Sequence, residues 1–277
     1  MSELPYCQTL LLDVENQWLR IWLNRPESRN ALSEELVSEL RQVLEAVRED
    51  RSIRGITLRG CGGVFCAGGD LKAFKRVFQS ESGNHQAAID SNRGGGELFN
   101  LINTMPQVVL MLVEGAAMAG GLGMLCAADI VAVTRDAKFS LTETTLGIPP
   151  AQIAPFVVNR LGLPTARRLM LTAARFDGNE AGRLGLANYV VDDAAELEII
   201  EQQTRGSVQK CAPGANAATK RILIATSQLE GDSLIDFAAE QFADAMLSAE
   251  GREGLSAFAE KRKPSWAIQQ DSGKSEL

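Results

Sequence analysis

The chain has 277 residues, of which 45% are hydrophobic and 23% charged, the balance of a globular protein with a sizeable core. Its 28 basic and 35 acidic side chains give a net charge of −7, which argues against general binding to nucleic acids or anionic membranes. The longest aliphatic run, VVLMLV, is too short to span a bilayer, and the N-terminus lacks a basic segment followed by a long apolar run. We therefore expect a cytoplasmic protein whose partners include neither nucleic acid nor membrane.

Metal and disulfide sites are not expected. The five cysteines are odd in number and lack the paired spacing of zinc sites, so we interpret them as reduced thiols. The chain has one histidine, and its acidic residues do not cluster at the spacing of metal ligands.

The first half of the chain alternates strands with helices. Residues 9–14 and 18–23 predict a hairpin, and Ser33 is placed to cap a helix that continues through about Glu49. Further strands are expected at residues 53–58, 108–113 and 130–133. This alternation favours a parallel sheet with crossover helices.

A polar, glycine-rich stretch at residues 78–96 predicts a loop before a helix at 97–103. It contains His85, which we interpret as a solvated side chain without a catalytic role. Later segments predict helices near 164–173 and 178–184 and a strand at 187–191. From Ala194 the pattern is almost entirely helical, with breaks near Pro213 and Gly231 and a last helix at 252–263.

Two glycine-rich turns are the main candidates for chemistry. Ala119-Gly120-Gly121 lies between an apolar strand and an apolar helix, where unpaired N–H groups at the helix N-terminus suit an anion or a polarised carbonyl. The alternative is that small residues only allow this helix to pack closely. A second glycine pair, in FCAGGDLK, is also expected to open a helix. Two N–H donors from separate turns are what an oxyanion hole requires.

These motifs match a known family. The segments NRPESRNALS, FCAGGDLK, GAAMAGGLGMLCAAD, FSLTETTLGI and EGLSAFAEKRKP occur in the order and spacing of the crotonase superfamily of enoyl-CoA hydratases and isomerases, which the chain resembles over nearly its whole length. The resemblance implies an α/β fold with a repeated strand-strand-helix spiral core at residues 1–193, which binds CoA and substrate, and a helical trimerisation segment at 194–277. Periodicity alone would equally permit a doubly wound sheet.

The resemblance also implies roles for individual residues. Gly69 and Gly120 would supply the oxyanion N–H groups, and Glu143, on the helix expected after the second motif, would move the proton. Positions that would contact the substrate or its CoA are Ser28, Arg29, Ala31, Ala67, Gly68, Asp70, Leu71, Lys72, Gly121, Phe258 and Lys261. The last two would reach CoA from a neighbouring subunit, although Lys261 equally fits a basic helix end. The expected partners are an acyl-CoA thioester and other copies of the chain, as a trimer or a dimer of trimers, and no cofactor is expected because CoA is part of the substrate.

One departure from the family pattern bears on the reaction. Well-known hydratases of the family carry a second glutamate three residues after the oxyanion glycine, where this chain has Gly123. A single carboxylate favours a Δ3,Δ2-enoyl-CoA isomerase. The segment TETTLGIPPAQIAPFVVNRLG, in contrast, resembles bacterial hydratases of branched glutaconyl-CoA thioesters, of the 3-methylglutaconyl and isohexenylglutaconyl types.

We place the hydratase first, with Glu143 as the principal acid and base. Gln152 is a candidate to help hold water, or else it is a capping or solvent-facing amide. The isomerase and a non-catalytic acyl-CoA-binding protein remain as alternatives. A glutaconyl substrate needs a cation for its distal carboxylate. Lys75, Arg76 and Arg160 are of the right type, but none is assigned.

Overall fold

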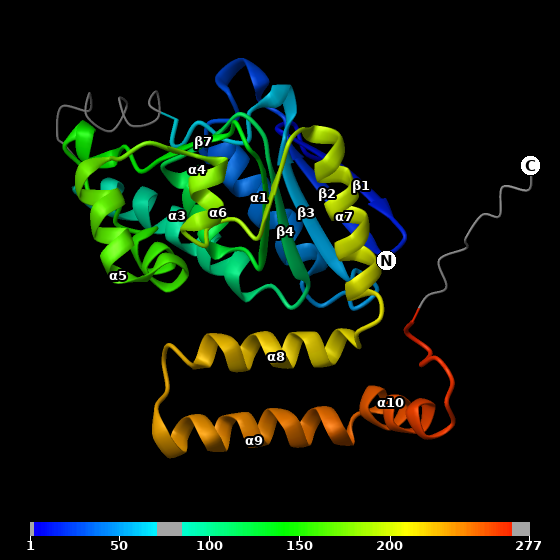
Figure 1. The fold of residues 1–277 in the computed structure, drawn as a ribbon. Coiled ribbons are helices and arrows are strands. Elements are labelled where there is room, and N and C mark those ends of the chain that lie inside the picture. The colour runs from blue at the N-terminus through cyan, green and yellow to red at the C-terminus, as the bar shows by residue number, and fades with distance from the viewer. Residues whose placement is uncertain (1–2, 71–84, 268–277) are drawn as a thin grey trace, which may run out of the picture. The chain divides into compact units, whose positions relative to one another are not determined.

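The computed structural model describes residues 3–70 and 85–267, which form two units at residues 1–201 and 202–277 (Figure 1). The division falls inside helix α7 (Ala194–Val208), and the boundary predicted after residue 193 lies at the start of that helix.

The main sheet of the first unit has the strand order β1-β2-β3-β4-β6-β9. Its strands are β1 (Leu10–Glu15), β2 (Trp18–Leu23), β3 (Gly55–Gly60), β4 (Val108–Val113), β6 (Ile130–Thr134) and β9 (Tyr189–Val191). The first two form the predicted antiparallel hairpin, and every later pair is parallel. The expected parallel sheet is therefore confirmed. Its central strands are almost wholly buried, which explains their continuous apolar sequences.

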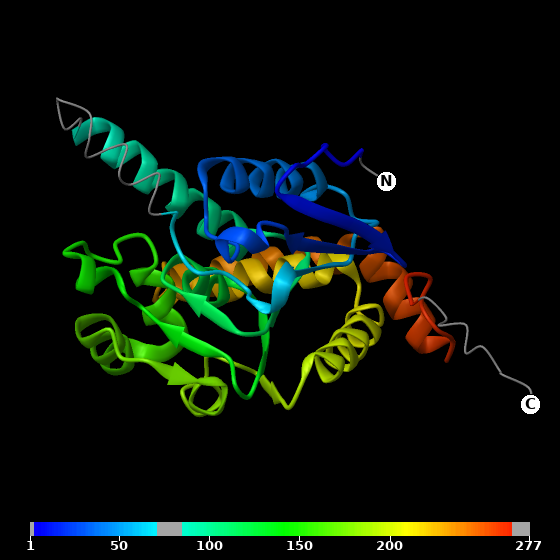
Figure 2. The same cartoon turned by 90° about the horizontal axis from the view of Figure 1, so that it is seen from above.

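Helices connect these strands as the parallel topology requires. They are α1 (Glu34–Val47), α3 (His85–Thr104), α4 (Gly120–Ala127), α5 (Ala154–Thr172) and α6 (Gly178–Arg183). Ser33 caps α1, as predicted, by accepting a 3.2 Å hydrogen bond from the Leu36 amide. In Figure 2, α1 runs alongside the hairpin of β1 and β2, onto which it packs. Short 3₁₀ turns are η1 (Pro26–Ser28), η2 (Cys61–Gly63) and η3 (Glu143–Leu146).

A second, smaller sheet was not predicted. It consists of β5 (Ala116–Met118), β7 (Lys138–Ser140) and β8 (Phe176–Asp177), with β5 and β7 parallel and β7 and β8 antiparallel. Strands this short carry little periodicity, and they form because segments distant in sequence pair with one another. This sheet leads the chain into both α4 and η3.

The loop predicted at residues 78–96 is wrong for its described part, because α3 begins at His85. Hydrogen bonds between residues four apart support this half of the helix, from Gln86 to Asp90 and from Arg93 to Glu97. Gln152 also donates a 2.8 Å bond to Asn92. The side chains here are largely exposed, and Figure 2 shows this half of α3 extending away from the rest of its unit. Residues 78–84 lie outside the described part.

A buried polar network attaches the first half of α7 to the main sheet. The Trp18 indole N–H donates to the Thr57 hydroxyl at 2.8 Å, and that hydroxyl donates to Glu201 Oε1 at 2.8 Å. Arg20 donates to the same carboxylate oxygen at 3.1 Å. The Trp18 indole, the Thr57 hydroxyl and Glu201 Oε1 therefore each have a hydrogen-bond partner, as burial requires.

The second unit contains the end of α7 and the helices α8 (Pro213–Ala225), α9 (Gly231–Leu247) and α10 (Ala249–Ala259). The predicted breaks near Pro213 and Gly231 are confirmed as the starts of α8 and α9. Ser248 caps α10 by accepting a 3.0 Å hydrogen bond from the Gly251 amide. The last predicted helix, at 252–263, begins three residues earlier and ends at Ala259.

Candidate active site

The turn before α4 is fixed by the second sheet. The Ala119 amide donates a 2.9 Å hydrogen bond to the Ser140 carbonyl at the end of β7. Ala119 has φ 49° and ψ −119°, a conformation that residues other than glycine rarely adopt. The sharp turn places the Gly120 amide in the first turn of α4, where no carbonyl of the same helix accepts it.

The Gly68-Gly69 turn lies directly against this one. The Met118 amide donates to the Cys66 carbonyl at 2.9 Å, so the two chain segments run side by side. Gly68 has φ +98°, and a Cβ atom there would lie 3.0 Å from the Ala119 Cβ. Close approach and positive φ together require glycine at position 68.

The backbone around Gly69 pairs with Leu32 along one edge, and the amide of Gly69 lies on the opposite edge. The Leu32 amide donates to the Gly68 carbonyl at 2.8 Å, and the Asp70 amide donates to the Leu32 carbonyl at 3.1 Å. This parallel pairing directs the amide of Gly69 itself away from the neighbouring segment. No described residue accepts a hydrogen bond from that amide. Gly69 and Gly120 thus lie in touching turns, each with a free backbone donor.

Glu143 lies three residues after Ser140 and opens η3, a 3₁₀ turn rather than the expected helix. Its Oε2 atom is buried and has no hydrogen-bond partner among the described residues. Burial raises the pKa of this carboxyl group, and a hydrogen bond from its own backbone amide offsets the rise only in part. A partly buried carboxyl with one unpartnered oxygen and a raised pKa is suited to take up and release a proton.

The positions predicted to contact CoA near the start of the chain meet those of the first glycine turn. The Ala67 amide donates to the Arg29 carbonyl at 2.9 Å. Arg25 donates to the Ala31 carbonyl at 2.8 Å and pairs with Asp70 at 3.4 Å. The residues brought together in this way are Ser28, Arg29, Ala31, Ala67, Gly68 and Asp70.

Asn30 fixes this arrangement, and the sequence analysis gave it no role. It is fully buried, and its side-chain amide donates to the carbonyls of Cys61 at 2.9 Å and Val64 at 2.6 Å. Its Oδ1 accepts a 2.8 Å bond from the Arg25 amide. The segment NRPESRNALS could have indicated a turn at this residue. Asparagine tolerates the left-handed backbone conformation that Asn30 adopts, with φ 56°.

Gly121 serves close packing. A Cβ atom there would lie 2.9 Å from both the Cys66 Cβ and its carbonyl oxygen, which supports the packing interpretation for this glycine. Burial raises the pKa of the Cys66 thiol to about 12. Cys66 therefore stays protonated near neutral pH and does not compete with Glu143 as a base. All five cysteines lie in the described part of the chain, and no two of them form a disulfide.

Gly123, where a second glutamate was considered, faces the side chain of Ile153. A Cβ atom at Gly123 would overlap the Ile153 Cγ2 methyl and lie 3.0 Å from its Cβ. Ile153 is buried just before α5. No side chain larger than hydrogen fits at position 123 unless Ile153 moves.

Other candidates have different surroundings. His85 is exposed at the start of α3. Gln152 donates a hydrogen bond to Asn92 on α3, so its amide nitrogen already has a partner. Arg160 donates to the carbonyls of Ala128 and Leu186 and to Asn188, so its guanidinium holds the fold together.

Some predicted site residues cannot be placed with the others. Leu71 and Lys72 lie outside the described residues, as do Lys75 and Arg76. Phe258 and Lys261 belong to the second unit, where the Phe258 side chain is exposed and Lys261 follows α10. Their contact with CoA stays a prediction.

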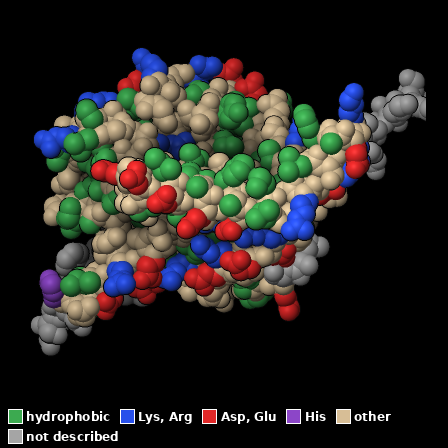
Figure 3. Space-filling model, turned by 90° about the horizontal axis from the view of Figure 1, so that it is seen from below, with side chains coloured by type: hydrophobic (Ala, Val, Ile, Leu, Met, Phe, Trp, Pro, Cys, Tyr) green, Lys and Arg blue, Asp and Glu red, His purple; other side chains and the backbone are tan. Residues whose placement is uncertain are grey.

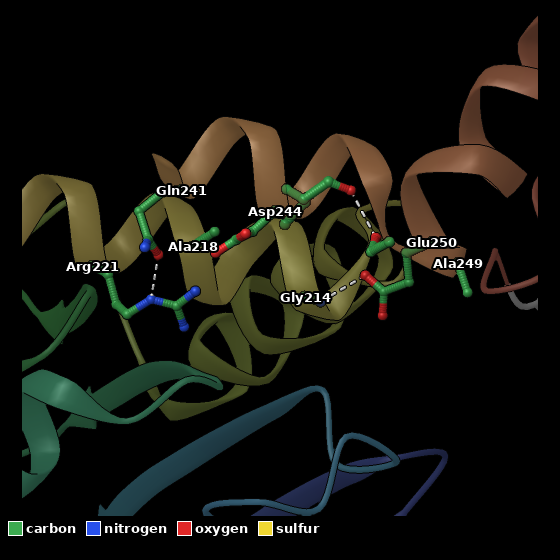
Figure 4. A pocket seen from close by; sticks show the side chains of 10 residues that line it. Gly214, Ala218, Arg221, Gln241, Asp244, Ala249 and Glu250 are labelled. Atoms are coloured by element: carbon green, nitrogen blue, oxygen red, sulfur yellow. Dashed lines mark hydrogen bonds between the residues drawn. The ribbon is translucent and has the colours of Figure 1, made fainter. Parts of the chain in front are cut away.

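The second unit has a hollow of about 350 Å³ between α8, α9 and the start of α10 (Figure 4). Some of its polar groups pair with one another. Arg221 donates to Gln241 at 2.6 Å, and the Gly214 amide donates to Glu250 at 2.8 Å. Among the described residues that line it, none belongs to the predicted site.

In the part of the chain that the structure describes, histidine, cysteine, aspartate and glutamate side chains form no group that could hold a metal ion. None of the helices described is long and apolar enough to cross a membrane.

Comparison with known proteins gives consistent results. Residues 13–269 match the model of the family described as Enoyl-CoA hydratase/isomerase. Human Enoyl-CoA hydratase domain-containing protein 2, mitochondrial, is 34% identical over 252 residues, covering 88% of this chain and 83% of that protein. Mouse Methylglutaconyl-CoA hydratase, mitochondrial, is 30% identical over 259 residues, covering 91% and 81%. The solved structure of Pseudomonas aeruginosa AtuE has a TM-score of 0.90 and 51% identity, covering 94% of this chain and 100% of that chain.

Proposed function

The chain belongs to the enoyl-CoA hydratase/isomerase family, and from that premise we propose that it adds water across the C2–C3 double bond of an enoyl-CoA thioester. Its predicted crotonase-like α/β fold and its membership of an enzyme superfamily are confirmed. The observation that carries the proposed chemistry is the buried, unpartnered Oε2 of Glu143. Glu143 follows Ser140 by three residues in the chain. The Ser140 carbonyl accepts the hydrogen bond from Ala119 that fixes the turn before Gly120.

In the proposed reaction the thioester oxygen accepts hydrogen bonds from the amides of Gly69 and Gly120. Negative charge grows on this oxygen as the oxygen of water attacks C3, and each donor contributes about 3 kcal/mol of transition-state stabilisation. The ionised Glu143 takes a proton from the attacking water and then returns a proton to C2. One O–H bond breaks, a C3–O and a C2–H bond form, and the double bond becomes single. The atoms balance without a redox cofactor, and CoA stays attached as part of the substrate.

We assign the acyl group to the branched glutaconyl class. The identity to a protein named methylglutaconyl-CoA hydratase supports this choice, together with the segment from Thr142 onward. A distal carboxylate then needs a cation. Arg160 does not fit that role, because three acceptors already occupy its guanidinium. The cation is left to another residue, with Lys75 and Arg76 as the remaining candidates by type.

An isomerase is the second candidate, and the contact between Gly123 and Ile153 favours it. Position 123 holds no carboxylate, and Ile153 takes the space that one would need. A single carboxylate suffices to remove a proton from C2 of a 3-enoyl thioester and to add one at C4. In both reactions Glu143 acts first as a base and then as an acid, and in the hydratase it must also activate a water molecule without help from a second carboxylate.

We also propose that the chain assembles with copies of itself, as a trimer or a dimer of trimers. Large apolar side chains of the second unit are more than half exposed, namely Leu223, Ile235, Phe242, Leu247, Leu255 and Phe258. Figure 3 shows hydrophobic side chains gathered in a band on the surface in view. Exposed apolar surface of this kind is typical of interfaces. Light scattering tests this proposal, with a mass of three or six chains expected and that of one chain contradicting it.

The reaction is tested by incubating the protein in water enriched in heavy oxygen with crotonyl-CoA, 3-methylglutaconyl-CoA and a 3-enoyl-CoA. Mass analysis of the thioesters follows. We expect heavy oxygen in a 3-hydroxyacyl product, with 3-methylglutaconyl-CoA preferred. Conversion of the 3-enoyl to a 2-enoyl thioester without oxygen incorporation would establish the isomerase instead. No product from any of the three would favour the non-catalytic binding protein.

A further inference from the structure

The first turn of α4 presents two glycines on one face. Gly120 and Gly123 are three residues apart, so the hydrogens that replace their side chains point the same way. A Cβ atom at Gly120 would lie 2.9 Å from Leu32 Cδ1 and 3.7 Å from Phe99 Cζ. At Gly123 it would lie 3.4 Å from the same Phe99 carbon, in addition to its overlap with Ile153. Apolar side chains therefore cover this face, beginning beside the proposed oxyanion donor.

Two of these side chains are firmly held. Phe99 comes from α3 and meets Phe156 of α5 edge to face, with ring centroids 6.1 Å apart. Ile153 directly precedes α5, and both Phe99 and Ile153 are buried. The helices on either side of α4 thus hold an apolar wall, formed by Phe99 and Ile153, against its glycines.

We propose that Ile153, backed by Phe99, determines which acyl groups the enzyme accepts. The inference rests on the proposed function, which places the thioester oxygen at Gly120. The wall lies within one helical turn, about 5.4 Å, of that glycine. The first carbons of the acyl chain span this distance, so an apolar branch at C3 packs against Ile153.

The wall has a second consequence, for the polar end of the substrate. A carboxylate placed against Phe99 and Ile153 would lose its water without gaining a partner, which is costly. The distal carboxylate of a glutaconyl group therefore points away from this wall while its branch points toward it. Because Ile153 also leaves no room for a side chain at Gly123, Glu143 remains the proton-transfer group on its own.

The substrate test uses 2-enoyl-CoA thioesters that carry hydrogen, methyl or propyl at C3. We measure kcat/KM for the wild type, Ile153→Ala and Ile153→Val. The ratio of kcat/KM for propyl to that for methyl should rise about tenfold or more in Ile153→Ala, because each methylene in an apolar pocket changes discrimination by roughly 10- to 200-fold. Ile153→Val should give a smaller rise in the same direction, and it replaces the alanine variant if that one fails to fold.

A control separates specificity from general weakening of the core. Ile21 is fully buried in β2, in register with Leu12 of β1 and Leu58 of β3, so Ile21→Val should lower Tm without changing the ratio. Unchanged ratios in both Ile153 variants would overturn the proposal. An equal change in Ile21→Val would overturn it as well.

A second pair of variants tests the contact itself. Gly123→Ala should lower both Tm and kcat/KM, because the new methyl overlaps Ile153. The double variant Gly123→Ala/Ile153→Ala should recover at least half of the lost Tm, since residues in contact show non-additive effects. Additive losses would contradict the assigned contact.

These results stay informative if the hydratase proposal fails. Should the wild type isomerise 3-enoyl thioesters instead, the same ratio is measured with that reaction. Should no reaction occur, dissociation constants of saturated 3-methyl and 3-propyl acyl-CoA replace kcat/KM. A tenfold shift toward the propyl compound in Ile153→Ala is then expected, and an unchanged preference overturns the inference.

Discussion

The Ala119 amide donates a 2.9 Å hydrogen bond to the Ser140 carbonyl, and this bond joins the two segments that carry the proposed chemistry. Gly120 directly follows the first residue, and Glu143 lies three residues after the second. The proposed oxyanion donor and the proposed proton-transfer group thus both follow the same end of one small sheet. Movement of β7 relative to β5 would displace both together, so we expect substitutions in this sheet to affect turnover more than binding.

The first prediction concerns the pH dependence of activity. Glu143 must be ionised to take a proton from water, and burial raises its pKa above the ordinary glutamate value of about 4.3. We expect kcat/KM to fall on the acid side with an apparent pKa above that value. A profile of kcat/KM against pH, recorded at constant ionic strength, measures this apparent pKa. An acid limb at or below the ordinary value would contradict the assigned burial.

The same shift predicts a pH-dependent effect on stability. The folded state holds the Glu143 proton more tightly than the unfolded state, so this group makes the protein less stable as pH rises from the ordinary glutamate pKa to the raised one. Glu143→Gln should therefore have a higher Tm than the wild type near pH 8. The advantage should disappear below about pH 4.3. Equal Tm values for the wild type and Glu143→Gln from pH 4 to pH 8 would contradict the predicted direction of this effect.

Gly68 is predicted to be indispensable for the geometry of the first turn. Gly68→Ala places a Cβ at positive φ and 3.0 Å from Ala119, so we expect a loss of about 1–3 kcal/mol in the free energy of unfolding. We also expect kcat to fall more than about tenfold, because the Gly69 donor shifts. Gly94→Ala is the matched control. It meets no neighbour in α3 and should stabilise the protein by about 0.5–1 kcal/mol.

Asn30 should contribute strongly to stability. Asn30→Ala leaves the carbonyls of Cys61 and Val64 and the amide of Arg25 without their partner. Each of these groups that water does not reach should lower the free energy of unfolding by about 1–3 kcal/mol. We expect a loss of at least about 2 kcal/mol in chemical denaturation. Asn159→Ala, at an exposed position of α5, should change stability by less than about 0.5 kcal/mol. Similar losses in the two variants would show that the buried network is not the cause.

Local patterns were sufficient to predict much of the fold. The hairpin, the helix capped by Ser33 and the strand at 108–113 follow from signals within a few residues. The second sheet could not be predicted in this way, because its strands form only through pairing with distant segments. The first half of α3 was missed since Gly94, Gly95 and Gly96 lower helix propensity, whereas contacts such as that of Gln152 restore the helix.

The candidate site shows a similar division. The resemblance to the crotonase superfamily, carried by the spaced motifs, implied roles for Gly69, Gly120 and Glu143, and these roles stay predictions. The raised pKa expected for a proton-transfer carboxylate agrees with the direction found for Glu143, although its polar neighbours Thr142 and Thr144 do not themselves show that it is desolvated. The sequence also gave no sign of the role proposed for Ile153. That proposal depends on the contact with Gly123, thirty residues earlier in the chain.

The most direct test of the account is the activity of Glu143→Gln, which keeps the size of the side chain but cannot exchange a proton. We predict that kcat/KM falls by about 10²- to 10⁴-fold for the best enoyl-CoA substrate. The dissociation constant for a saturated acyl-CoA should change by less than about threefold, because the uncharged amide leaves the CoA contacts and the oxyanion donors in place. Activity within tenfold of the wild type would mean that another group moves the proton.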